Sequence, residues 1–169
     1  MHSPETALFV SLYAHDRAPQ FAARETKQLI LSKMAETKKQ FRLNVAGYVL
    51  LDDHLHWLFL SPAGNENTAV INHFRSAVQR DWRIRQRSEA QLWAAGGVTR
   101  PLTGRDDLRH HLDFIHYDPV RHEVVARAAD YPWSSFPARV AEGHYADDWG
   151  TMGPPAGVEK VRQHALLAA

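Results

Sequence analysis

The chain contains no cysteine. This absence excludes disulfide bonds, thiolate metal sites and catalysis by a cysteine nucleophile. No apolar run reaches the roughly 18 residues that a membrane-spanning helix needs. The polar start, Met1 to Glu5, also lacks the basic-then-apolar pattern of a secretory signal. We therefore expect a cytoplasmic protein that does not associate with a membrane.

The chain also lacks an excess of charge of one sign, because it contains 20 Lys and Arg and 19 Asp and Glu. The net charge of +1 therefore indicates no partner. The local distribution says more, since five arginines lie between Arg75 and Arg87 with Asp81 as the one acid among them. Such a cluster can bind phosphate even on a nearly neutral protein. The alternative is a solvated helix face, which has the same pattern.

What the chain does have is a full set of core-forming residues. Hydrophobic residues make up 44% of the 169 positions, with five Trp and seven Phe. This composition is typical of a folded domain and excludes a disordered chain. The length suits one domain, and there is no internal repeat or low-complexity stretch. We expect a single domain over residues 1–150 and a C-terminal tail over residues 151–169.

The apolar periodicity predicts alternating strands and helices. Strands are expected at 7–13, 43–51 and 54–60, and helices at 18–39, 66–87 and 106–117. The last helix should begin near Asp106 or Asp107 as cap and end at Asp118, because Pro119 disfavours helical backbone in the residue before it. The irregular stretch 94–104 has room for a short edge strand. With a hairpin turn at Asp52 and Asp53, this order predicts an α+β fold with an antiparallel sheet and helices mainly on one face.

Two histidines in the third predicted strand form a candidate metal site. Residues i and i+2 of a strand point to the same face, so His54 and His56 project together. Two imidazoles on a rigid strand supply half of a metal site, and a third ligand must come from elsewhere. The pair alone is weak evidence, because a chain with eleven histidines forms such spacings by chance. The alternative is two partly buried histidines bonded to nearby backbone.

Four separated segments form a more specific pattern. They read LDDHLH at 51–56, DFIHYDPVRH at 113–122, DYPWSSF at 130–136 and YADDW at 145–149. In the same order, they resemble motifs of the single-tyrosine HUH transposases, in the branch associated with repetitive extragenic palindromes (REPs). The resemblance covers about residues 7 to 150.

This resemblance implies a ferredoxin-like HUH domain that acts on single-stranded or hairpin DNA. In the family, two histidines and an amide side chain on the last helix hold a divalent metal, which polarises the scissile phosphate. A tyrosine one turn before the amide attacks that phosphate and forms a phosphotyrosine link. Family members are monomers or dimers, so the resemblance also allows a homodimer.

Carried over by position, His54 and His56 match the family histidines, and Asp118 stands at the place of the amide ligand. A carboxylate can bind Mg²⁺ or Mn²⁺ at least as well as an amide, because these cations favour oxygen. Phe114 stands at the nucleophile position. It keeps the i, i+4 relation to Asp118 but has no hydroxyl and cannot attack phosphorus. The family pattern is also altered at Arg100, which replaces a histidine.

Tyr117 is the remaining candidate nucleophile. It follows Phe114 by three residues and is still its neighbour on the helix. The alternative is a packing or base-stacking role for Tyr117. Four functions stay open: a covalent transposase using Tyr117, a DNA-binding module without covalent chemistry, a metal-dependent nuclease using water, and a structural relic.

The expected DNA contacts come from two residue types. Arginines bind phosphates, and aromatic side chains stack on bases. For Trp57 core packing is favoured over stacking. The residues predicted to contact DNA are Arg75, Arg80, Arg83, Arg100 and Trp93.

Overall fold

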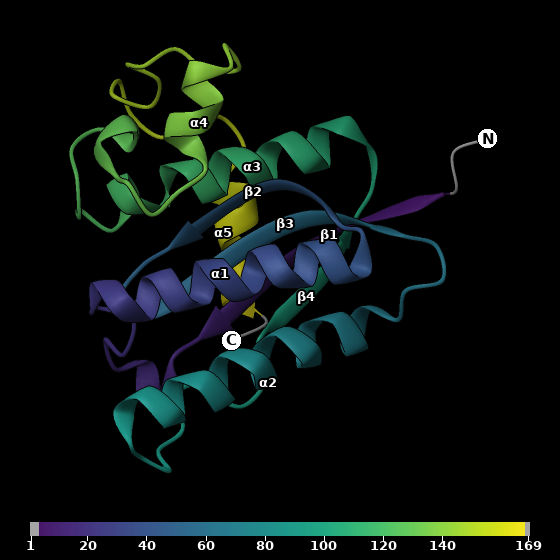
Figure 1. The fold of residues 1–169 in the computed structure, drawn as a ribbon. Helices are drawn as coiled ribbons and strands as arrows, with labels where there is room; N and C mark the ends of the chain where they lie inside the picture. The colour runs from purple at the N-terminus through teal and green to yellow at the C-terminus, as the bar shows by residue number, and fades with distance from the viewer. Residues whose placement is uncertain (1–3, 168–169) are drawn as a thin grey trace.

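The computed structural model describes the backbone of residues 4–167 and the side chains of residues 4–163. Residues 1–3 and 168–169, which belong to the predicted polar start and the predicted tail, lie outside the described residues. The main elements follow one another along the chain as shown in Figure 1. They are β1 (Glu5–Tyr13), α1 (Arg24–Phe41), β2 (Asn44–Leu50), β3 (His54–Pro62), α2 (Asn67–Gln86), β4 (Val98–Leu102) and α3 (Gly104–Arg121).

These elements build a four-stranded antiparallel sheet. Its strand order is β2-β3-β1-β4, and every neighbouring pair is antiparallel. The two central strands are in register from Glu5↔Pro62 to Tyr13↔His54. A βαββαβ chain with this strand order is ferredoxin-like, so the predicted α+β class is confirmed. The predicted hairpin at Asp52 and Asp53 and the edge strand within 94–104 are present.

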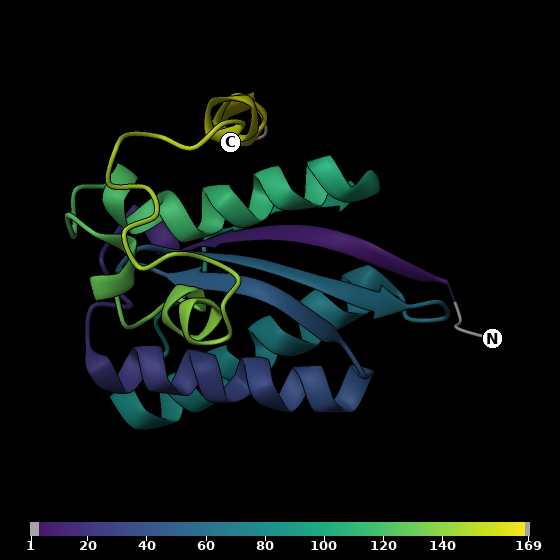
Figure 2. The same ribbon diagram turned by 90° about the horizontal axis from the view of Figure 1, so that it is seen from above.

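Helices cover both faces of the sheet, whereas the sequence predicted helices mainly on one face. On one face α1 and α2 pack over a cluster that includes Leu55 and Trp57. On the other face α3 packs over a cluster that includes Phe9 and Leu58 (Figure 2). The central strand β3 carries large apolar side chains on both faces, and each face needs its own cover. The histidines of β3 share the face of Leu58, below α3.

The helix α3 extends past the predicted end at Asp118, and that prediction was wrong. Pro119 lies inside the helix. Proline removes one backbone donor but leaves the following N–H groups free to bond. The N–H of His122 donates to the carbonyl of Asp118 over 3.0 Å, and the buried side chain of Asp118 is anchored by Arg121. At the other end, the helix begins earlier than predicted: Thr103 is the N-cap residue, and Asp106 and Asp107 lie in the first turn. Asp107 accepts the backbone N–H of Thr103 from within the helix.

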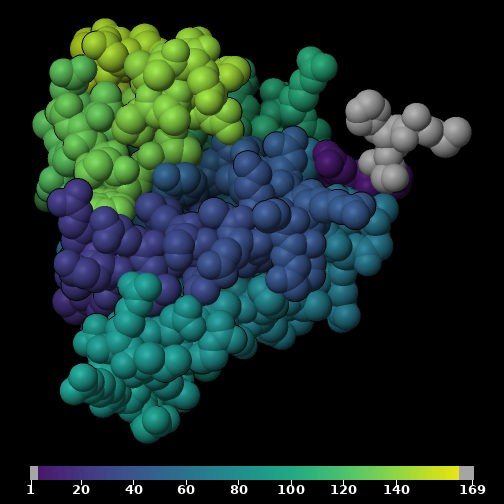
Figure 3. Space-filling view, viewed as in Figure 1, coloured from purple at the N-terminus to yellow at the C-terminus, as the bar shows by residue number. Residues whose placement is uncertain are grey.

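The segment after α3 contains the short helix α4 (Phe136–Ala141) and the helix α5 (Val158–Leu167). The part that includes α4 lies next to α1 in the space-filling view (Figure 3), whereas α5 packs on α3 on the side away from α1 (Figure 2). The hydroxyl of Tyr131 ties this segment to β2 by donating to the carbonyl of Leu50 over 2.6 Å. Val158 and Val161 of α5 are buried in the apolar cluster of α3. Part of the predicted tail therefore packs on the domain.

Within the part of the chain that the structure describes, no helix is long and apolar enough to cross a lipid bilayer.

Gly97 allows the loop before β4 to approach β1 closely. Its φ is +132°, and a Cβ there would lie 2.7 Å from the carbonyl oxygen of Ser11. Gly97→Ala is expected to destabilise the fold by about 1 to 3 kcal/mol, since both the backbone angle and the contact disfavour a side chain. Gly64→Ala is the matched control, because Gly64 has φ +99° but open space around it. Equal free energies of unfolding in urea for the two variants would contradict the predicted clash.

Candidate metal centre

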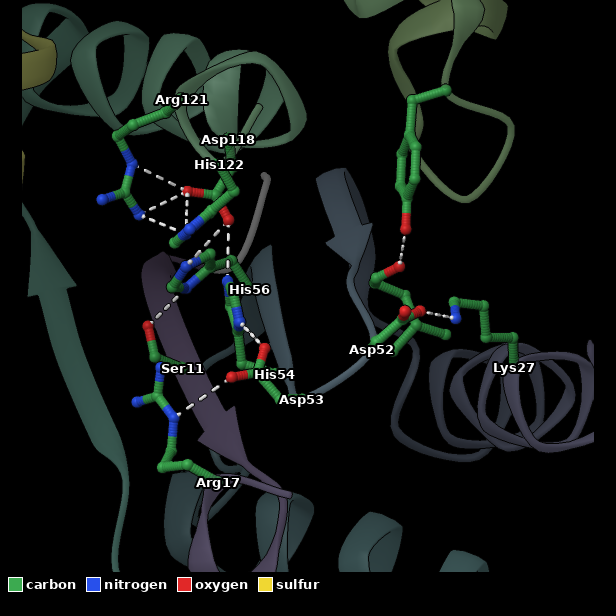
Figure 4. A network of polar contacts seen from close by, with 12 residues as sticks. Ser11, Arg17, Lys27, Asp52, Asp53, His54, His56, Asp118, Arg121 and His122 are labelled. Atoms are coloured by element: carbon green, nitrogen blue, oxygen red, sulfur yellow. Dashed lines mark hydrogen bonds and ion pairs between the residues drawn. The ribbon is translucent and has the colours of Figure 1, made fainter. Parts of the chain in front are cut away.

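The candidate metal centre lies between β3 and the last turn of α3. His54 Nε2 is 2.8 Å from Asp118 Oδ2, and His56 Nε2 is 3.5 Å from the same oxygen. The strand period places both imidazoles on the face below α3, and the helix brings the carboxylate to them. The structure thus brings together the three residues that the sequence analysis proposed as ligands (Figure 4).

The other nitrogen of each imidazole is held by a polar side chain. His54 Nδ1 is 2.6 Å from Asp53 Oδ1, and His56 Nδ1 is 2.6 Å from Ser11 Oγ. A partner on the far nitrogen fixes the orientation of a ligating histidine and raises its basicity. Both Nε2 atoms are consequently directed at one carboxylate oxygen.

The second oxygen of Asp118 faces residues of its own helix. Asp118 Oδ1 accepts hydrogen bonds from Arg121 Nε over 3.0 Å and Nη2 over 2.5 Å. His122 Nε2 lies 3.5 Å from Oδ1. One ligand atom each from His54, Asp118 and His122 lies within 4.8 Å of the others. His122 was not among the predicted ligands, although its i+4 spacing from Asp118 places it on the same helix face.

Burial and neighbouring charges set the protonation of this centre. Burial would raise the pKa of Asp118, but the imidazoles of His56, His122 and His54 hold it well below its ordinary value. Burial lowers the pKa of His56 to about 3, against the opposing effect of Asp118. For His54 burial is outweighed by hydrogen bonds to Asp118 and Asp53, so its pKa is raised. An ionised carboxylate and a neutral imidazole are the forms that ligate metal.

The donor set fits a divalent metal. Imidazole nitrogens converge on a carboxylate, and their orientation is fixed by Asp53 and Ser11. A cavity of about 380 Å³ borders the centre and is lined by His54, His122 and residues that include Lys27. The centre therefore has ligands of suitable chemistry and a space beside them.

Phe114, and not Tyr117, borders the metal centre. The Phe114 ring is buried, with its centroid 5.3 Å from that of His56 and 4.9 Å below the Arg121 guanidinium. Tyr117 instead packs against Trp149, with ring centroids 6.4 Å apart. Its ring also lies against Gly150. The aromatic residue beside the candidate ligands is therefore the one without a hydroxyl.

Trp93 is placed in the core, which argues against its predicted contact with DNA. Its ring packs on Phe21 and Phe74, with centroids 5.2 and 5.9 Å away. Its indole N–H donates to the carbonyl of Arg75. With 6% of its surface exposed, it presents no face to a base. Trp57 is fully buried, as core packing requires.

The predicted phosphate-binding arginines are divided between the two sides of the sheet. Arg75, Arg80 and Arg83 belong to α2, on the face opposite α3. Arg75 donates to the carbonyls of Ala94 and Gly96 and so binds the loop before β4 to α2. Arg100 lies on β4 opposite Phe9 and so shares the face of α3. Its buried Nε has no hydrogen-bond partner among the described residues.

A buried histidine of α3 predicts a pH-dependent stability. Burial, with the nearby Arg139 charge, lowers the pKa of His116 to about 3. In the unfolded chain it titrates near 6.5. The unfolded state binds more protons between these values, so stability is full above pH 6.5 and falls toward pH 3. The expected slope is up to about 1.4 kcal/mol per pH unit.

The measurement is urea unfolding of the wild type and His116→Gln at pH 7 and pH 5. The wild type should lose more stability than the variant over this interval. Identical losses would show that His116 does not contribute to the pH dependence.

Comparisons with known proteins agree with the motifs. The chain is 26% identical over 128 residues to the REP-associated tyrosine transposase of Escherichia coli, covering 72% of each chain. It is 29% identical over 129 residues to a Haemophilus influenzae protein provisionally given the same name, covering 70% of this chain and 73% of the relative. No family model matches the chain.

Solved structures show the same fold. A REP-associated tyrosine transposase bound to a REP hairpin matches with a TM-score of 0.75 and 21% identity, over 88% of each chain. A Deinococcus radiodurans protein provisionally described as a transposase matches with a TM-score of 0.52 and 12% identity, over 73% of this chain and 91% of its own. The relatives in sequence, the ordered motifs and this common fold agree: the chain is similar to REP-associated tyrosine transposases in sequence and shares their fold.

Proposed function

We propose that this protein is a transposase-like DNA-binding protein that holds single-stranded or hairpin DNA with the help of a divalent metal. The observation that carries the proposal is the convergence of His54 and His56 on the buried carboxylate of Asp118. A solved protein with the same fold is a REP-associated tyrosine transposase bound to a REP hairpin, which supports hairpin DNA as the partner.

The metal would be held by His54, His56 and Asp118, with His122 as an additional donor. The carboxylate oxygen suits Mg²⁺ or Mn²⁺, and the imidazoles favour the more nitrogen-tolerant Mn²⁺. When bound, such an ion supplies positive charge to a phosphate oxygen. Ser11 and Asp53 orient the two strand histidines for this role.

The DNA strand near the metal would contact the α3 side of the sheet. Arg100 supports this placement, because it shares the face of the centre and its buried Nε has no hydrogen-bond partner within residues 4–163. Arg80 and Arg83 are on the opposite side, where α1 and α2 carry nine Lys and Arg against three acids. These two residues would contact a different DNA segment, such as the duplex stem, through phosphates.

We assign binding, and not covalent strand transfer, to the wild-type chain. The position beside the metal centre holds Phe114, whose ring contacts His56 and Phe9. The ring of Tyr117 packs against that of Trp149. A phosphotyrosine link needs a hydroxyl near the scissile phosphate, which neither residue provides in this arrangement.

A metal-dependent nuclease that uses water is the second candidate function. The cavity of about 380 Å³ beside His54 and His122 favours it, because water and a phosphate could enter there. In this reaction a water oxygen attacks phosphorus, the bond to one deoxyribose oxygen breaks, and that oxygen takes a proton.

One experiment separates these functions. A labelled hairpin oligonucleotide with single-stranded flanks is incubated with the protein and Mn²⁺ or EDTA, then run on native and denaturing gels. We expect a shifted complex that is weakened by EDTA, with no covalent band. Cleavage without a covalent band would identify the nuclease, and absence of any complex would refute the proposed function.

Arg100→Ala tests the placement of the DNA. It should weaken hairpin binding and reduce the slope of log affinity against log salt by about 1, as expected for one lost phosphate contact. Arg105→Ala is the matched control, because Arg105 is exposed at the start of α3 and is not a proposed contact. Equal effects of the two substitutions would contradict the assignment of Arg100.

A further inference from the structure

A second and larger cavity lies beside α3. Its volume is about 550 Å³, and residues of α3, β2 and the segment 139–149 line it. None of its lining residues belongs to the candidate metal centre. The cavity is lined mainly by the polar and aromatic side chains of Arg109, Asp113, His116, Arg139, Tyr145 and Trp149.

A chain of hydrogen bonds fixes the carboxylate of Asp113 in this cavity. Ser135 Oγ is 2.7 Å from His116 Nε2, and His116 Nδ1 is 3.1 Å from the Tyr145 hydroxyl. That hydroxyl donates to Asp113 Oδ1 over 3.1 Å. With His116 neutral and its proton on Nδ1, the ring donates to the Tyr145 hydroxyl, which in turn donates to the carboxylate. The other oxygen, Oδ2, accepts no hydrogen bond from the described residues.

The surroundings of Asp113 combine an aromatic wall with positive charge. Tyr145 and Trp149 are half-buried, and their ring centroids are 4.9 Å apart. Arg109 lies one helical turn before Asp113, and 67% of its side chain is exposed. Partial burial raises the pKa of Asp113, so its ionised form would be stabilised by further donors. A flat ligand with hydrogen-bond donors on its edge and a nearby phosphate fits these features.

We propose that this cavity binds one unpaired nucleobase of the DNA, and that Asp113 selects guanine by accepting two hydrogen bonds from its Watson–Crick edge. Guanine is the base that presents two adjacent donors there, N1–H and N2–H, while adenine and cytosine present a donor beside an acceptor. The base stacks on Tyr145 or Trp149, which is how proteins hold splayed bases. Arg109 contacts the attached phosphate. This inference rests on the proposed function and adds a base-specific subsite to it.

The test uses mononucleotides as probes. Deoxyguanosine and deoxycytidine monophosphates are titrated into the full-length protein and followed by NMR or calorimetry. We expect the guanine nucleotide to bind on the order of tenfold more tightly, as a good bidentate contact provides. Asp113→Asn should remove the preference, because the amide cannot accept both bonds. Asp16→Asn is the control, since Asp16 is exposed and does not line the cavity, so this variant should leave the preference intact.

Equal affinity for both nucleotides, or an unchanged preference in Asp113→Asn, would overturn the proposal. Urea unfolding verifies that each variant is folded. Tyr145→Phe is a milder variant, because it removes the hydrogen bond from Tyr145 to Asp113 but keeps the aromatic ring.

A hairpin-binding assay with Mn²⁺ separates this inference from the proposed function. Selective binding of the guanine nucleotide without hairpin binding would refute the proposed function but not the base subsite. Hairpin binding that does not change when each unpaired guanine of the probe is replaced by cytosine would refute the subsite alone.

Discussion

Replacing Asp118 with alanine is expected to abolish metal binding and to cost several kcal/mol of stability. Asp118 Oδ2 is the atom on which both strand histidines converge. Loss of an outer partner of a metal ligand costs about 10- to 100-fold in affinity, so loss of the carboxylate itself should exceed 100-fold. The substitution also leaves Arg121 and His54 without their buried counter-charge. Breaking one side of such a pair costs about 3–5 kcal/mol.

Two measurements test this prediction. Titration with Mn²⁺, followed by the loss of the free-ion electron paramagnetic resonance signal, reports affinity. Urea unfolding reports stability. Asp118→Asn should retain measurable metal binding, because its amide oxygen can still act as a ligand. Asp106→Ala, an exposed change on the same helix, is the control. Wild-type Mn²⁺ affinity in Asp118→Ala would show that the third ligand was assigned wrongly.

Two features of the sequence predicted the sheet and the closeness of His54 and His56 to Asp118: local periodicity and short motifs. The strand period placed His54 and His56 on one face, and the ordered motifs indicated the helix that supplies the carboxylate. The predicted end of α3 at Asp118 was wrong because it rested on the local backbone preference of a residue before proline. In the fold, Asp118 is buried and bonded to Arg121, and these tertiary contacts outweigh that preference.

The DNA contacts predicted for the α2 arginines and for Trp93 depended on how the elements pack together, which the sequence does not show. The arginines of α2 are clustered in the sequence, but the sequence does not show which face of the sheet this helix covers. The structure places them across the sheet from the centre, with Arg75 bonded to a neighbouring loop. Likewise, aromatic character alone did not distinguish a stacking residue from a core residue at Trp93, which a β-bridge between its own backbone and Ala14 draws into the core.

Phe114→Tyr is expected to create a covalent protein–DNA intermediate that the wild type does not form. Phe114 lies one turn before Asp118 on the same helix face, and its ring contacts that of His56. A hydroxyl on this ring would border the metal centre. Its oxygen could attack the phosphorus of a bound strand, forming a phosphotyrosine bond while the bond to a deoxyribose oxygen breaks and that oxygen takes a proton.

The readout is a labelled hairpin oligonucleotide with Mn²⁺, separated on a denaturing gel. A protein-linked band should appear with Phe114→Tyr and disappear in the double variant that also carries His54→Ala. Adding Tyr117→Phe to Phe114→Tyr should leave the band in place, because Tyr117 packs against Trp149 and not against the centre. The decisive contrary result is a band in the wild type that Tyr117→Phe removes. It would assign the nucleophile to Tyr117 and would require α3 to rotate when DNA binds, since Phe114 now occupies the position beside His56.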